Sequence, residues 1–587
     1  MLSLLTLRFT ERLSGYFMKM INNLKGAEPQ SAIDNLRHLV YRNDEKYGNK
    51  VLYRYKEDSK SEFKTYTYGK LREEVDAIGT AFAVLGLLDC GIALTGEVYP
   101  RFFATYLATV TGGGYAVPID RDISPEQTAN FIIRSESKAV VYTRIQNTKI
   151  EEIAKELPDV KYFIPLQPGE NFRFCDRVKT IDEIIEIGKK AISDGNREFI
   201  DHEIDMEKMS ALLFTSGTTG TAKGVMLSHK NLTAATNAAV LSMSYDKNNT
   251  FISALPPHHS YEITCGEMAI MSLGAEILIN DSLKHILRNM GEYKPNALML
   301  VPLFVETMHK RIWDEVKKKK LTGTLKFLMG LNKALLFCHI DIRNKLFSKI
   351  TGAFGGNLKS IVCGGAPLSP QIIKDFYAFG ITVLEGYGIT ECAPLVAVNS
   401  PGKVRFHSVG QPVKNCRVMI EKQDPSDETG EICVKGDNVM MGYFKDPEST
   451  KEVFTDDGWF RTGDIGYIDD EGYIFITGRK KNVIILSNGK NVFPEELEEH
   501  IVPVTYILES VVTVRETEGE PALTAICVPN MELLEGKSDE EIYSIIKSEI
   551  DKINRDLPTY KKMLKVEIRK EPFERNTAKK IMRFKVN

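Results

Sequence analysis

Short apolar runs alternate with helical patterns along most of this chain. The helical patterns lie at residues 73–85, 102–109 and 149–156. The apolar runs that predict buried strands lie at residues 91–94, 139–142, 277–280, 297–301 and 360–363. Strands that alternate with helices favour parallel sheets covered by helices on both faces. The pattern therefore predicts an α/β body.

The pattern of apolar and polar residues changes after about residue 409, where short alternating strands are separated by Gly and Asp turns. Strands are predicted at residues 418–421, 431–434 and 473–477, which favours a small antiparallel barrel or sheet. Beyond Gly478, helices at 494–500 and 539–554 mix with strands at 523–528 and 565–568. This last segment is long enough to fold as a small, mobile α+β domain. The predicted divisions are an extension at 1–32, a body at 33–478 and a C-terminal domain at 479–587.

Composition excludes some functions and leaves others open. The 587 residues carry a net charge of -3, which offers no basic footprint for nucleic acid. Nine cysteines without a C-x-x-C pair favour free thiols in a reducing cytoplasm. No window resembles a membrane span. The first 24 residues are mildly amphipathic and basic, and three interpretations stay open: a docked or frayed terminal helix, an upstream start preceding Met18 or Met20, or contact with a membrane surface.

The sharpest local signal is a loop rich in Gly, Ser and Thr at residues 213–229. An apolar strand runs into Thr215, and the loop that follows ends near Lys223. Several residues of this loop can direct backbone N–H or hydroxyl groups toward an anion. They are Thr215, Ser216, Gly217, Thr218, Thr219 and Gly220. The glycine spacing does not fit a Walker A loop, because Gly224 follows Lys223. The pattern predicts a phosphate-binding loop.

This loop resembles the signature of the adenylate-forming, AMP-binding superfamily, and further motifs follow in the family's order. The resemblance covers the chain from about residue 33 to its end. The local sequence is most similar to the bacterial long-chain fatty acid acyl-CoA synthetase branch at residues 214–229, 302–306 and 310–312.

The central motif at residues 384–391 has the chemistry of a nucleotide site. Tyr387 offers a face for adenine, Thr390 can donate to phosphate, and Glu391 supplies a hard oxygen ligand for Mg2+, with Thr215 as the second ligand. The other residues expected beside the nucleotide are Gly365, Ala366, Glu385, Gly386, Gly388, Asp464, Arg479 and Lys481. Asp464 would accept the ribose hydroxyls, Arg479 would reach ribose and phosphate, and Lys481 matches the family's hinge.

The resemblance also implies an acyl pocket, a thiol tunnel and a terminal lysine. His259, Gly364 and Gly365 would edge the acyl pocket, and Ser487, Asn488 and Gly489 would line a pantetheine tunnel. Lys580 would steady the α-phosphate during adenylation and withdraw as the C-terminal domain rotates. Lys579 stands where the family usually has glycine, so it remains a rival for this role.

Together these residues imply that ATP activates a carboxylic acid as acyl-AMP and that coenzyme A then takes the acyl group. A long- or medium-chain fatty acid is the expected substrate. Alternatives are transfer to an acyl carrier protein, an aryl or short acid, or a non-catalytic nucleotide-binding regulator. Lysines at 317–320 beside apolar residues at 325–329 and 334–337 fit either a solvated helix or a peripheral membrane contact of a cytoplasmic protein. The oligomeric state stays open.

Overall fold

The computed structural model describes residues 32–57, 61–167, 172–215, 222–401, 403–485, 491–517, 520–575 and 581–586. The chain divides into two compact units. The first contains the chain up to Leu368 together with Ile372–Arg417 and Lys435–Gly458. The second contains Ser369–Gln371, Val418–Val434 and Trp459–Asn587. The extension predicted at 1–32 lies almost wholly outside the described residues.

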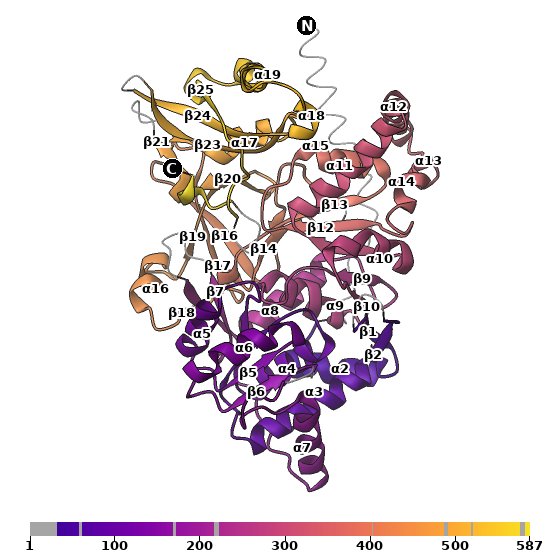
Figure 1. The fold of residues 1–587 in the computed structure, drawn as a ribbon, viewed down its shortest axis with the longest axis vertical. Coiled ribbons are helices and arrows are strands. Elements are labelled where there is room, and N and C mark those ends of the chain that lie inside the picture. The colour runs from indigo at the N-terminus through magenta and orange to yellow at the C-terminus, as the bar shows by residue number, and fades with distance from the viewer. Residues whose placement is uncertain are drawn as a thin grey trace. The chain divides into compact units, whose positions relative to one another are not determined.

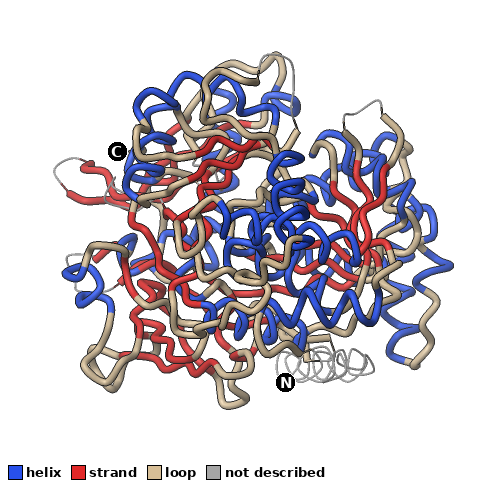
Figure 2. The backbone as a smooth tube through the Cα atoms, turned by 90° about the horizontal axis from the view of Figure 1, so that it is seen from below, coloured by secondary structure: helices blue, strands red, loops and turns tan. Residues whose placement is uncertain are grey.

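The first unit contains two large sheets (Figures 1 and 2). The nine-stranded sheet has the order β15-β14-β13-β12-β11-β9-β10-β1-β2. Its strands are β1 (Val51–Tyr55), β2 (Lys64–Thr67), β9 (Thr250–Ser253), β10 (Glu276–Ile279), β11 (Ala297–Leu300), β12 (Ser360–Gly364), β13 (Thr382–Gly388), β14 (Leu395–Val398) and β15 (Gln411–Pro412). The block from β1 to β13 is parallel, as the apolar runs predict, while β2, β14 and β15 pair antiparallel.

The seven-stranded sheet has the order β18-β8-β7-β4-β3-β5-β6. Its strands are β3 (Gly91–Thr95), β4 (Tyr115–Ile119), β5 (Ala139–Tyr142), β6 (Tyr162–Pro165), β7 (Met209–Thr215), β8 (Lys223–Ser228) and β18 (Gly442–Tyr443). The parallel strands β3 to β6 are connected by α4 (Pro100–Thr111), α5 (Pro125–Arg134) and α6 (Asn147–Ile153), and α3 (Tyr68–Val84) precedes β3. Further helices of the unit are α2 (Leu36–Tyr47), α7 (Ile181–Ser193), α8 (His229–Ser242) and α16 (Pro447–Val453).

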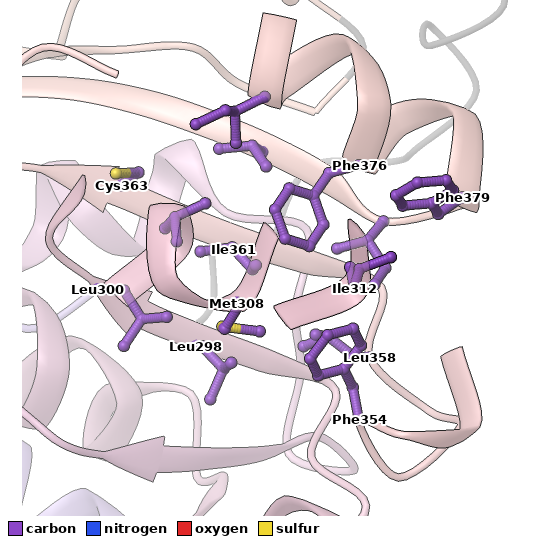
Figure 3. Packing of buried hydrophobic residues seen from close by; sticks show 14 of the residues in the cluster. Leu298, Leu300, Met308, Ile312, Phe354, Leu358, Ile361, Cys363, Phe376 and Phe379 are labelled. Carbon is purple, nitrogen blue, oxygen red and sulfur yellow. The ribbon is translucent and has the colours of Figure 1, made fainter. Parts of the chain in front are cut away.

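A hydrophobic cluster joins the nine-stranded sheet to the helices that follow it (Figure 3). Leu298 and Ile361, from neighbouring strands, contribute to it. Met308 and Phe376 come from α11 (Pro302–Lys318) and α15 (Pro370–Phe379). The same region contains α10 (Ile286–Tyr293), α12 (Thr322–Phe337), α13 (Arg343–Leu346) and α14 (Ser348–Gly352). Burial of these apolar side chains fixes the helices on one face of the sheet.

The second unit contains the small antiparallel sheet and the C-terminal domain that the sequence predicts. The four-stranded sheet has the order β16-β17-β19-β20, formed by Cys416–Glu421, Gly430–Gly436, Phe460–Ile468 and Ile474–Arg479. The C-terminal domain has a three-stranded sheet of β23 (Ile507–Thr517), β24 (Glu520–Pro529) and β25 (Lys565–Ile568), packed with α17 (Pro494–Ile501) and α19 (Asp539–Asp556). A capping box between Ser538 and Glu541 starts α19.

Two fully buried carboxyl groups lie on the π-helix η4 (Tyr261–Met268) of the first unit. The Tyr53 hydroxyl donates to Glu267 Oε2 at 2.6 Å, and the Ser253 hydroxyl donates to Glu262 Oε1. Burial raises the pKa of Glu267 to about 8 and raises the pKa of Glu262 well above its ordinary value. Burial therefore favours the protonated, neutral form of both carboxyl groups, which is the form that can lie in an apolar core.

Glu267→Gln should flatten the pH dependence of stability. The folded pKa of Glu267 lies above its unfolded value of 4.5, so its contribution is intact below pH 4.5 and is lost as the pH rises to about 8. The loss amounts to roughly a few kcal/mol. Melting temperatures at pH 5 and pH 8 should therefore differ less in Glu267→Gln than in the wild type. Glu571→Gln, at an exposed position, is the control. An equal pH dependence in Glu267→Gln and wild type would show that Glu267 is ionised in the fold.

Candidate active site

The parallel strands of the nine-stranded sheet bring three motifs to one edge. β9, β11, β12 and β13 run in the same direction, so their carboxyl ends meet at the same side. The segments that follow these strands begin at Ala254, Val301, Gly365 and Ile389. The motif of His259, the glycine pair and the Thr390-Glu391 motif are therefore neighbours in space, although they are far apart in sequence.

Gly364 and Tyr261 join two of these motifs. The Tyr261 hydroxyl donates to the carbonyl oxygen of Val362 at 3.0 Å. A Cβ added at Gly364 would lie 3.6 Å from Cζ of Tyr261 and 3.4 Å from the carbonyl oxygen of Gly386, its partner on β13. A Cβ at Gly364 would thus make ordinary van der Waals contacts with Gly386 and Tyr261, and the approach of a ligand to Gly364 stays a prediction.

Gly365 and Ala366 are exposed just beyond β12. Gly365 has φ +92°, a left-handed conformation that favours glycine. Tyr387 is buried in β13, whereas Glu385, Gly386 and Thr390 are half-buried. At Gly388 a Cβ would lie 2.5 Å from the carbonyl oxygen of Pro394, so no larger residue fits without a shift.

Lys223, Tyr443 and Glu391 form a connected polar group in the first unit. The Tyr443 hydroxyl donates to Glu391 Oε1 at 3.1 Å, and Lys223 Nζ lies 4.8 Å from the centre of the Tyr443 ring. Burial, followed by the Glu391 carboxylate, raises the pKa of Tyr443 above its ordinary value. The hydroxyl therefore stays protonated and orients the carboxylate, while the ring contacts the lysine by a cation–π interaction.

Backbone pairing holds this group in place. Tyr443 on β18 pairs with Val225 on β8. The Phe444 N–H donates to the Gly224 carbonyl oxygen at 2.7 Å, and the Met440 N–H donates to the Glu391 carbonyl oxygen at 2.8 Å. Thr215 pairs with Lys223 across the β7–β8 hairpin, and its hydroxyl donates to the Lys223 carbonyl oxygen at 3.4 Å. The ends of the predicted phosphate loop are thus adjacent ladder residues.

Several predicted residues lie outside the described part of the chain. They are Ser216, Gly217, Thr218, Thr219, Gly220, Ser487, Asn488, Gly489, Lys579 and Lys580. The residues around the terminal lysines are described: Arg575 and Ile581 pair with each other, and Arg575 Nη2 lies 2.8 Å from Glu509 Oε1 on β23.

His259 follows β9 and is half-buried, and its ring centre lies 4.1 Å from that of His258. His258 Nε2 lies 3.6 Å from Oδ2 of Asp120, which follows β4 of the other sheet. Burial lowers the pKa of His258 despite the neighbouring carboxylate, so this ring is neutral near pH 7. The histidine motif therefore lies close to a residue that follows a strand of the other large sheet.

Asp464 and Arg479 are partners in the second unit. They face each other across β19 and β20, with Arg479 Nε 2.7 Å from Asp464 Oδ1. Asp464 is buried, whereas Arg479 is exposed. A second pair lies beside the first, with Lys480 Nζ 2.6 Å from Glu431 Oε2. The exposed Lys481 follows in the short helix η7 (Lys480–Asn482).

The residues present fit a magnesium ion carried by a nucleotide better than a resident metal centre. The described residues contain no group of three or more His, Cys, Asp or Glu side chains able to hold a metal. Mg2+ in nucleotide sites needs only one or two protein oxygens, because phosphate oxygens and water complete its octahedral shell. The Glu391 carboxylate and the Thr215 hydroxyl, both half-buried around Lys223, are suitable donors.

Residues 40–444 match the family described as AMP-binding enzyme, and residues 481–587 match the AMP-binding enzyme C-terminal domain. The chain belongs to the AMP-binding enzyme family. Among solved structures, the adenylation domain of a carboxylate reductase from Mycobacterium chelonae has a TM-score of 0.77 at 20% identity, covering 99% of this chain and 95% of that one. This likeness confirms the predicted fold.

Curated relatives are similar over most of their length. Long-chain-fatty-acid–CoA ligase 5 of Rattus norvegicus is 30% identical over 74% of this chain and 67% of its own. A chloroplastic long-chain-fatty-acid–[acyl-carrier-protein] ligase, AEE15 of Arabidopsis thaliana, is 28% identical over 82% of this chain and 75% of its own. Both relatives are eukaryotic, so placement in the bacterial branch stays a prediction.

Three residues of this region are missing from the sequence prediction: Tyr443, Tyr261 and His258. Tyr443 lies 52 positions from Glu391, and no local pattern connects them. Tyr261 and His258 flank the predicted His259, and the motif alone does not show which side chain reaches Val362 or Asp120.

Proposed function

We propose that this AMP-binding enzyme joins a long- or medium-chain fatty acid to coenzyme A. Membership of the family across both of its domains, with a long-chain fatty acid ligase at 30% identity, is the observation that carries the proposal. A carboxylate oxygen attacks the α-phosphorus of ATP, and the bond to pyrophosphate breaks, which gives acyl-AMP. The thiol sulfur then attacks the acyl carbonyl carbon and AMP leaves.

The residues of the first unit act mainly by electrostatics and positioning. Lys223 offers positive charge to the phosphates, and the hydroxyl of Thr215 together with Glu391 would hold Mg2+, which neutralises phosphate charge when bound. Tyr443 keeps the Glu391 carboxylate oriented through its hydroxyl, at 3.1 Å. Tyr261 supports the backbone of β12 beneath the glycines that would face the adenine and the acyl group.

Asp464 is proposed to accept hydrogen bonds from the ribose hydroxyls, and Arg479 to orient it. The ion pair at 2.7 Å holds Oδ1 of a buried carboxylate in a fixed position without a ligand. Burial also lowers the local dielectric constant around Asp464, so its hydrogen bonds with ribose are stronger than the same bonds would be in water. Lys481 is proposed as the hinge about which the C-terminal domain rotates between the two half-reactions.

A second acceptor is supported by one relative. The plant ligase named for an acyl carrier protein is 28% identical to this chain. Coenzyme A and carrier proteins present the same phosphopantetheine thiol, so the chemistry of the site does not choose between them.

A substrate panel tests the proposal. Pyrophosphate release would be measured with acids from acetate to palmitate and with benzoate, each with coenzyme A, with acyl carrier protein or with neither. We expect turnover with coenzyme A that is highest for long- or medium-chain acids. Faster turnover with the carrier protein would favour the second acceptor, and an absence of pyrophosphate with every acid would contradict the proposal.

Lys580→Ala should abolish pyrophosphate release and leave thioester formation from supplied acyl-AMP largely intact. A single ammonium beside the α-phosphate is needed only while charge develops there. The two half-reactions would be assayed separately in Lys580→Ala and in the matched variant Lys579→Ala. If Lys579→Ala alone gives this split, the adenylation lysine is Lys579.

Tyr443→Phe should raise the Mg2+ concentration needed for half-maximal pyrophosphate release. Loss of a hydrogen bond to a carboxylate costs about 1.5–3 kcal/mol, which is at least about tenfold in binding. Tyr543→Phe, on the exposed face of α19, is the control. An unchanged Mg2+ requirement in Tyr443→Phe would remove Tyr443 from the metal-positioning role.

A further inference from the structure

Helix α12 turns an apolar face to solvent. Phe327 is 70% exposed, Leu331 is 40% exposed and Phe337 is 51% exposed. Leu321 just before the helix and Ile340 just after it are exposed as well. Five of the seventeen large hydrophobic side chains that are exposed in the described part of the chain thus fall within residues 321–340.

The opposite face of α12 is anchored to the first unit. Leu325 and Leu336 are buried, and Leu325 belongs to the cluster of Figure 3. Asn332 is 1% exposed, and its Nδ2 donates to the carbonyl oxygen of Ala378 on α15 at 3.2 Å. The helix is therefore fixed in its rotation about its own axis, and the apolar face is directed outward by the fold.

The outward stripe contains no charge. At 3.6 residues per turn, Phe327, Leu331, Ala334 and Cys338 lie on one face, and all four are exposed. Lys326 and Lys333 lie together on one flank of this stripe. A solvated surface helix places its charges in the middle of its outer face, so α12 has the reverse arrangement.

The surroundings of the stripe are strongly basic. Residues 317–349 contain nine Lys or Arg and one acidic residue, Asp341, in a chain whose net charge is -3. Asp341 is paired with Arg343, with Arg343 Nη2 2.7 Å from Asp341 Oδ2. Lys319 pairs with Glu315 just before the segment, so the positive charge at 317–349 is reduced but not cancelled by its acidic neighbours.

We propose that α12 lies flat on an anionic lipid surface, with Phe327 and Leu331 in the acyl layer and the neighbouring lysines at the headgroups. Apolar side chains on one face with lysines at its border are the pattern of interfacial helices. The charge of the segment favours lipid over a second copy of this chain. A second copy would place one basic segment against another, whereas anionic headgroups attract the lysines.

The geometry indicates a helix that lies on the membrane and does not cross it. No helix of the described residues is long and apolar enough to span a bilayer. The sixteen residues of α12 measure about 24 Å along the axis, which is shorter than the hydrocarbon core. Binding of α12 to lipid does not depend on the proposed ligase reaction. The lipid-binding proposal and the proposed function can therefore fail independently.

Vesicle sedimentation tests this surface with the full chain. Wild type should bind vesicles of phosphatidylcholine mixed with phosphatidylglycerol, and bind less to phosphatidylcholine alone or at high salt. Phe327→Ser/Leu331→Ser should lower the partition coefficient at least about tenfold. Lys326→Gln/Lys333→Gln should lower binding to the anionic vesicles severalfold and leave binding to neutral vesicles unchanged.

The matched control is Met531→Ser/Leu564→Ser, which removes two exposed apolar side chains of the C-terminal domain. It should bind vesicles like the wild type, and all variants should share the wild-type melting temperature. The proposal is overturned if wild type ignores anionic vesicles, or if Phe327→Ser/Leu331→Ser binds them unchanged. It is also overturned if Phe327→Ser/Leu331→Ser keeps wild-type lipid binding and instead loses a concentration-dependent dimer measured without lipid, because the stripe would then contact a second copy of the chain.

Discussion

The parallel pairing of β9, β11, β12 and β13 is the constraint on which the first unit depends. Parallel neighbours need long crossovers, so β9, β11 and β12 are each followed by a loop at the same edge and then by helical structure, whereas β13 leads into the antiparallel β14. The register Gly364 to Gly386 places two side-chain-free positions side by side at that edge. A register shift of one residue would bring either Tyr387 or Glu385 opposite Gly364, so the pair of Gly364 with Gly386 would be lost.

Hydrophobic pattern predicts the strands and helices of this body well, because burial on both faces of a parallel sheet leaves a continuous apolar run. The run predicted at 297–301 is the fully buried β11, and the helix predicted at 73–85 is α3. Contacts between distant segments are not predictable in this way. Tyr443 meets Glu391 only because β18 adds to the free edge of β8, and a two-residue strand leaves no periodic signal.

Buried carboxyl groups are accommodated in two ways. Some are matched by guanidinium or ammonium groups, as in Asp464 with Arg479 and Glu431 with Lys480 in the second unit and Glu74 with Arg101 in the first. Others are accommodated as the neutral form: in the core of the first unit, burial makes the charged form costly and so favours protonation of Glu262 and Glu267. Sequence shows acidic residues in both cases and cannot separate them, since the neighbouring side chains in the fold decide the outcome.

The same reasoning explains why α12 needs a different environment from the other helices. Asn332, Leu325 and Leu336 fix one face against the first unit, so the helix cannot rotate to bury Phe327 without breaking the hydrogen bond to Ala378. Exposed Phe327 and Leu331 then cost free energy in water, and the lysines on the flank keep the surface soluble. A fatty acid is most concentrated where its own chain is buried in lipid. A helix that binds anionic lipid would therefore bring the proposed ligase to the place where its substrate accumulates.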